Sequence, residues 1–150
     1  MKKLIIILVL IFSTLSAYCE TDSWPINGEF NGYDEILIEE DKDLRNLCQE
    51  CIWSLYCLRP EVKDTIYVGY AVHDDFLGEY VGYTFSDDNS SVIVIKRGCA
   101  DKRLMLHELA HALIQEQTHQ LGISKNHDCP EWYKMRCDII DLCGVDILNH

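Results

Sequence analysis

The sequence lacks internal repeats and low-complexity segments, and basic residues are scarce in it. Its 150 residues suffice for one domain with a hydrophobic core but not for two of ordinary size. The apolar content of 48% is that of a folded globular protein. Only 13 lysines and arginines stand against 25 aspartates and glutamates, a formal net charge of −12. Such acidity argues against binding to nucleic acid or to an anionic membrane.

The sequence also lacks an apolar run long enough to cross a membrane. The run at residues 4–12 has nine residues, whereas a spanning helix needs about 20. Lys2 and Lys3 precede it and the small, polar segment 13–17 follows it, which is the order of a secretory signal peptide rather than of an anchor. We therefore predict a signal peptide over residues 1–19 and a protein that is secreted or periplasmic, without stable membrane association after cleavage.

The eight cysteines indicate disulfide bonds if the protein is exported. If Cys19 is removed with the signal peptide, one of the remaining cysteines is left free or pairs between chains. Cys48 and Cys51 are spaced like half of a zinc ribbon, but the sequence has no second Cys-x2-Cys pair to complete it. The connectivity of the disulfides does not follow from the spacing.

Local patterns predict an α+β domain over residues 41–150, preceded by an irregular segment at 20–40 that contains Pro25 and Gly28. Apolar residues recur every three or four positions within residues 41–57, which predicts a helix. Segments rich in β-branched and aromatic residues predict a three-stranded, mostly antiparallel meander at residues 65–72, 79–85 and 91–96.

Two further helices are predicted after these strands. The first covers Lys102–Thr118, with Asp101 as its N-cap. A loop follows, and Pro130 then suits the start of a last helix over residues 131–142, which Gly144 ends.

His107, Glu108 and His111 form the motif His-Glu-x-x-His within the first of these two helices. Histidines four residues apart lie on one face of a helix, where both can ligate the same zinc ion. Glu108 lies one residue round the helix, close enough to hold a water molecule on the metal without ligating it. The predicted strand before this helix is an edge strand, of the kind on which metallopeptidases hold an extended peptide.

A catalytic zinc site needs a third protein ligand and an open position for water. His119, His127 and Glu131 all follow the motif. The metzincin pattern is excluded, because it needs glycine and histidine where this sequence has Ile114 and Gln117. A thermolysin-like site would use Glu131.

The motif, the loop after it and the segment His127-Asp128-Cys129-Pro130-Glu131-Trp132 resemble the SprT-like metallopeptidases and related minimal zincins. In that family a histidine after a loop of similar length is the third ligand, followed by Gly-Pro-Glu and an aromatic residue. The resemblance implies a zincin-like fold, one zinc ion held by His107, His111 and His127, Glu108 as the base and Trp132 as a packing anchor.

This sequence departs from the family pattern after His127, where one extra residue precedes Pro130. Glu131 and Asp128 therefore remain alternative ligands. The signal peptide and the acidic charge do not suit the DNA-linked members of the family, and the C-terminal zinc ribbon is missing. The resemblance is therefore carried over for the fold and the zinc chemistry only.

Together these features predict a secreted zinc metalloendopeptidase that acts on protein or peptide substrates, with Glu108 as general base on a zinc-activated water. One alternative is an inactive binding module with a protease-like fold, stabilised by zinc and disulfides. Another is a disulfide scaffold in which the motif is a coincidence. Tyr133 and Arg136 fall where an oxyanion-stabilising group could lie, but we assign that role to neither.

Overall fold

The computed structural model describes residues 22–58, 65–120 and 126–148. The strands are β1 (Asp22–Phe30), β2 (Tyr33–Glu39), β3 (Thr65–Ala71), β4 (Gly82–Ser86) and β5 (Ser90–Ile95). The helices are α2 (Lys42–Ser54), α3 (Lys102–Thr118) and α4 (Pro130–Cys143), with the short 3-10 helices η1 (Tyr56–Leu58) and η2 (Asp74–Phe76). The predicted signal peptide lies outside the described residues. No helix within them is long and apolar enough to cross a membrane.

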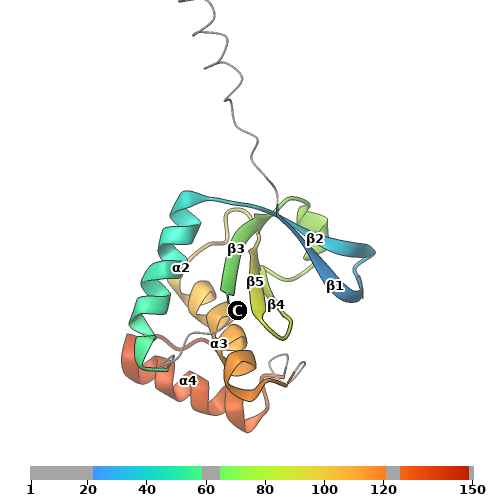
Figure 1. Cartoon of the computed structure of the whole chain (residues 1–150). Coiled ribbons are helices and arrows are strands. Elements are labelled where there is room, and N and C mark those ends of the chain that lie inside the picture. Colours follow the sequence, from blue (N-terminus) through green and yellow to red (C-terminus); the bar gives the residue numbers. More distant parts are fainter. Residues whose placement is uncertain (1–21, 59–64, 121–125, 149–150) are drawn as a thin grey trace, which may run out of the picture.

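The sheet has five strands in the order β1-β2-β3-β5-β4, so the predicted fold class with a three-stranded meander is wrong (Figure 1). β3 and β5 are parallel, and every other neighbouring pair is antiparallel. The turn signals after β3 indicate a hairpin to the next strand. Residues 72–81 instead contain η2 and carry the chain past the position of β5, which then enters between β3 and β4. The result is a mixed α/β fold with a curled sheet.

The segment predicted to be irregular, residues 20–40, contributes β1 and β2. Pro25 is tolerated because β1 is an edge strand, and the pairing shifts register between Pro25 and Phe30. Asn31 and Gly32 form the turn between the strands, with φ of 49° and 88°. An Asn-Gly pair is a strong hairpin signal, and here it outweighs Pro25 and the weak periodicity, which indicate irregular structure.

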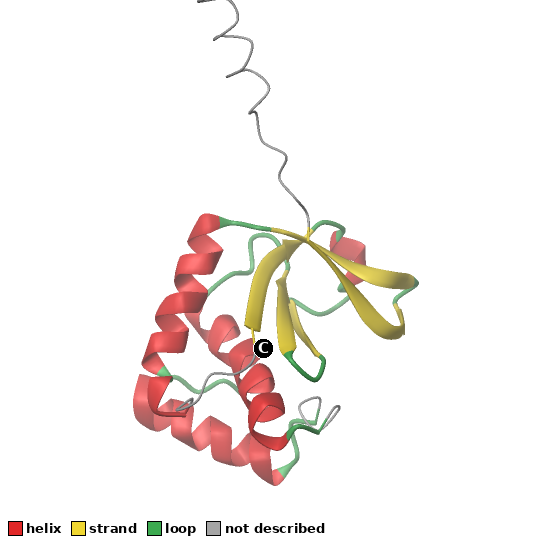
Figure 2. Ribbon diagram, viewed as in Figure 1, coloured by secondary structure: helices red, strands yellow, loops and turns green. Residues whose placement is uncertain are grey.

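The three helices lie together on one side of the sheet (Figure 2). Each begins and ends near its predicted position because the capping signals are local. Asp101 accepts a hydrogen bond from the Leu104 amide at 2.8 Å, and Asp41 accepts one from the Leu44 amide at 2.9 Å. Gly144, in the left-handed conformation with φ 66°, ends α4.

The core has two parts because β5 is covered on both faces. Ile93 and Ile95 pack toward the helices, whereas Val92 and Val94 pack with the apolar and aromatic side chains on the other face. β4 lies at the edge beyond β5, so the edge strand is β4 and not the predicted segment 91–96. Helix α3 contacts β4, β5, α2 and α4. The motif helix is therefore held between the sheet edge and α4.

Candidate metal site

His107 and His111 lie in the buried part of α3, with 7% and 9% of their surfaces exposed. The Nδ1 atom of His107 is 2.8 Å from the carbonyl oxygen of Ile147. A carbonyl oxygen can only accept, so Nδ1 carries the proton and donates it. The Nε2 atom of a neutral His107 is then left with a lone pair for a metal.

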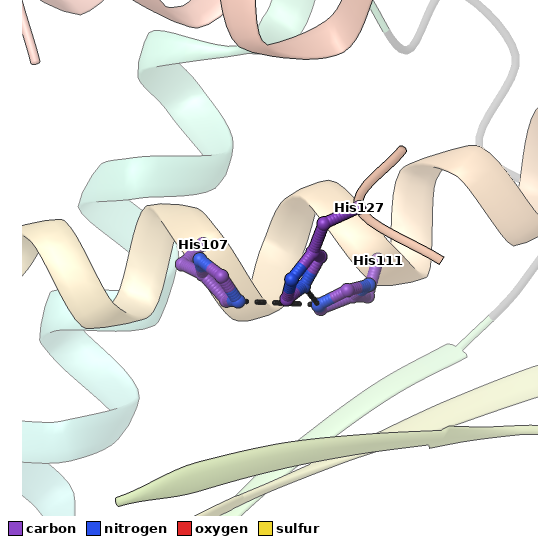
Figure 3. Close-up of side chains that lie close together, drawn as sticks. All are labelled: His107, His111 and His127. Carbon is purple, nitrogen blue, oxygen red and sulfur yellow. Dashed lines mark hydrogen bonds between the residues drawn. The ribbon is translucent and has the colours of Figure 1, made fainter. Parts of the chain in front are cut away.

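His127 reaches the same point from the segment that precedes α4 (Figure 3). Its Nε2 atom is 3.0 Å from Nε2 of His111, which is 3.2 Å from Nε2 of His107. Ligands of a tetrahedral zinc ion with bonds of 2.0–2.1 Å are about 3.3 Å apart. Ligand atoms of all three side chains lie within 4.8 Å of one another. The three histidines therefore lie close enough to bind one metal ion.

The Trp132 ring supports this arrangement from within the core. Trp132 is fully buried, as expected of a packing anchor, and stacks on His111 with 4.7 Å between ring centroids. Its ring is also 4.4 Å from His127 and 5.0 Å from His107. Partial desolvation lowers the pKa of His127, against the opposing effect of Asp128. This favours the neutral imidazole, which is the form that binds metal.

The other candidates from the sequence are not part of this group. Among the described residues, the set whose ligand atoms meet contains neither Glu131 nor Asp128 nor His119. His119 is the left-handed C-cap of α3, with φ 52°. Tyr133 is 51% exposed, and Arg136 forms an ion pair with Asp146.

Glu108 is buried beside the histidines, with 3% of its surface exposed. Its Oε2 atom is 2.7 Å from the hydroxyl oxygen of Thr84 on β4, and the same hydroxyl is 2.9 Å from the Glu108 carbonyl oxygen. Burial raises the pKa of Glu108 to about 7, and the hydrogen bond from Thr84 lowers it by a smaller amount. No basic side chain among the described residues forms an ion pair with it.

Gly82, two residues before Thr84 on β4, leaves the space that the Glu108 carboxylate occupies. A Cβ atom at position 82 would lie 2.9 Å from Oε1 and 3.2 Å from Cγ of Glu108. Any side chain there would push the carboxylate aside. One carboxylate oxygen therefore lies against Gly82 and the other accepts from Thr84, so β4 fixes the position of Glu108.

A cleft of about 310 Å³ opens over these groups, within the usual size range of ligand sites. Its lining consists of Tyr80, Gly82, Tyr83, Thr84, His107, Glu108, His111 and His127. One wall is α3 and the other is the edge strand with the segment before it. The arrangement can place a metal ion, a buried carboxylate and an extended ligand side by side.

The contributions of β4 and of the chain after α4 to the site were not predicted from the sequence. The order Gly82, Tyr83, Thr84, Phe85 alternates small and aromatic residues, which is a signal that one face of this strand meets a close neighbour. Ile147 carries no comparable signal, because its role depends on a main-chain carbonyl.

Comparison with models of protein families finds no family that matches this chain, and comparison with curated proteins finds no matching relative. The resemblance to SprT-like metallopeptidases therefore stays a prediction. The same holds for the disulfides. In the part of the chain that the structure describes, Cys51, Cys57, Cys99, Cys137 and Cys143 are not joined to another cysteine.

Proposed function

We propose that the protein is an exported zinc metallopeptidase that hydrolyses peptide bonds in protein or peptide substrates. The observation that carries this proposal is the position of Glu108, buried in the same cleft as His107, His111 and His127. Burial of a carboxylate costs stability, and no basic side chain among the described residues pairs with this one. A site that only held a metal for structural reasons would have no use for it.

The donor set supports zinc as the metal. Three neutral imidazoles suit zinc, and a site with three protein ligands leaves a fourth position for water. When bound, zinc supplies Lewis acidity and brings the pKa of a bound water to about 7.

The residues of the cleft have distinct roles in the proposed reaction. The Glu108 carboxylate, oriented by Thr84, takes a proton from the attacking water and passes it to the nitrogen of the leaving amine. A pKa of about 7 suits a group that must accept and then release a proton near neutral pH. Among the described strands, β4 pairs with β5 alone, so its other edge can pair with the backbone of an extended substrate. Export depends on residues 1–19 acting as a signal peptide.

The test is the substitution Glu108→Gln, which keeps the shape of the side chain but cannot accept the proton. We expect zinc content to be unchanged and cleavage of a mixed peptide pool to fall by at least about 100-fold, as for loss of a general base. His107→Ala is the matched control and should lose both zinc and cleavage. Zinc is measured by elemental analysis and cleavage by mass spectrometry.

Each contrary result has a definite meaning. Undiminished cleavage by the Glu108→Gln variant would refute the role of Glu108. Wild-type protein that holds zinc and cleaves none of the peptides would favour the inactive binding module. Wild-type protein without metal would refute both.

A further inference from the structure

The chain after α4 turns back and passes beside the first metal ligand. We propose that Asp146 is a positioning residue that holds His107 in its metal-binding tautomer through the peptide bond between Ile147 and Leu148. The inference rests on the proposed metal site. It assigns a role to residues outside the cleft, because Asp146, Ile147 and Leu148 are not in its lining.

The same peptide unit serves both His107 and Asp146. Its carbonyl oxygen, that of Ile147, accepts the proton of His107 Nδ1 at 2.8 Å. Its amide, that of Leu148, donates to Oδ1 of Asp146 at 3.1 Å. In a planar trans peptide the C=O and N–H bonds point in opposite directions. By holding the amide, Asp146 therefore aims the carbonyl at His107.

Asp146 is itself clamped by residues of two helices. Arg136 on α4 donates from Nε to Oδ1 at 2.7 Å and from Nη2 to Oδ2 at 2.6 Å. A bidentate pair of this kind fixes the plane of the carboxylate as well as its position. Arg103 on α3 donates from Nε to the Asp146 carbonyl oxygen at 2.9 Å. Segment 145–148 is thus attached to the helix that carries His107 and to the helix that follows His127.

Burial and charge keep this arrangement in place. Ile147 is fully buried in the core on the helix side of the sheet, which anchors the peptide unit next to His107. The hydrogen bond from Arg136 and that from the Leu148 amide lower the pKa of Asp146 to about 2. The carboxylate therefore remains ionised, and the clamp intact, throughout the pH range in which the histidines bind metal.

Loss of the clamp has a specific consequence for the metal site. If the Ile147 carbonyl turns away, either ring nitrogen of neutral His107 can carry the proton. In the tautomer protonated at Nε2, that nitrogen has no lone pair for the metal. Metal affinity then falls although all three ligands are still present.

The experiment compares Asp146→Ala with the wild type in the full chain, with zinc ions alone as the probe. We expect competition with a chromophoric chelator to give zinc binding weaker by about 10–100-fold, the usual effect of removing a group that orients a ligand. Asp138→Ala is the matched control. Asp138 forms an exposed ion pair with Lys134, with 2.7 Å between Oδ2 and Nζ, and both residues lie on α4. Removal of this pair should leave the affinity for zinc unchanged.

A second measurement detects the tautomer itself and needs no metal. Nitrogen-15 NMR of the metal-free wild type should show His107 protonated at Nδ1, and Asp146→Ala should show a mixture. Circular dichroism checks that each variant is folded. If Asp146→Ala does not fold, Arg136→Gln serves in its place and should change both readings in the same direction, by less.

Wild-type affinity and wild-type tautomer in a folded variant would overturn the inference. Failure of the wild type to bind zinc would instead overturn the proposed function, and the tautomer measurement would still decide the role of Asp146.

Discussion

Glu108 combines a cost in stability with a capacity for proton transfer. Its ordinary pKa is 4.5, and burial raises it to about 7. Between these values the folded protein keeps a proton that the unfolded chain has released. Because the folded state binds more protons there, stability falls as the pH rises through this range. The stability that protonated Glu108 contributes is fully present below about pH 4.5 and is lost as the pH rises through about 7.

We predict that Glu108→Gln removes this pH dependence from the metal-free protein. A raised pKa of this size corresponds to about 3 kcal/mol at about 1.4 kcal/mol per unit. Relative to wild type, the glutamine variant should gain about that amount between pH 4.5 and pH 8. Urea unfolding in the presence of a chelator, at a series of pH values, measures it. A difference that stays constant with pH would mean that folding does not raise the pKa of Glu108.

Some residues of the site could be predicted from the sequence and others could not. The spacing of His107, Glu108 and His111 is a property of one helix, so it was visible without knowledge of the fold. His127 stood beside Glu131 as an alternative until the structure brought it to the other two histidines. Thr84 could not be predicted, because a hydroxyl 24 positions away in the sequence meets Glu108 only through the packing of β4 on α3.

At the scale of elements, β4 forms the wall of the cleft that faces α3. Thr84 on its inner face donates to Glu108, and Gly82 leaves room for the carboxylate. If the proposed function is correct, the strand both orients the base and borders the substrate. Changes in β4 should then alter catalysis without altering metal binding.

The pair Thr84→Val and Thr84→Ser tests this. Valine keeps the shape of threonine but removes the hydroxyl, so we expect kcat/KM to fall by about 10-fold or more, the effect of losing a hydrogen bond to a charged group. Serine keeps the hydroxyl and should retain most activity. Zinc content should equal that of the wild type in both. Equal activity of the two variants would show that the hydroxyl has no part in catalysis.

The helices could be predicted from the sequence, whereas the order of the strands could not. Helices α2, α3 and α4 have local caps at Asp41, Asp101 and Gly144, so their positions followed from neighbouring residues. The sheet did not, because the order of strands depends on pairings between distant segments. Six residue pairs join β3 to β5 in parallel, and no local pattern distinguishes them from a meander.

For the whole molecule, the site ties together segments that are far apart in the sequence. His107 and His111 belong to α3, and His127 to the segment before α4. His107 is also bonded to Ile147 beyond α4. A metal held by all three histidines would therefore link α3 to the segment before α4, and the hydrogen bond of His107 already joins α3 to the segment after α4. A metal that binds only the folded state stabilises that state. The stabilisation grows with the logarithm of the ratio of the free metal concentration to Kd.

We predict that removal of the metal lowers the stability of the whole domain. With free zinc at about 1,000 times its Kd, the bound metal contributes about 4 kcal/mol. For a domain of this size, adding a chelator should lower Tm by about 10 °C. His127→Ala is the control, because it removes the most exposed of the three ligands. Its Tm should not respond to the chelator. The measurement is differential scanning calorimetry at neutral pH. At this pH the ionised fraction of Glu108 increases the loss of stability when the metal cation is removed. A wild-type Tm that the chelator does not change would contradict a metal bound at these three histidines.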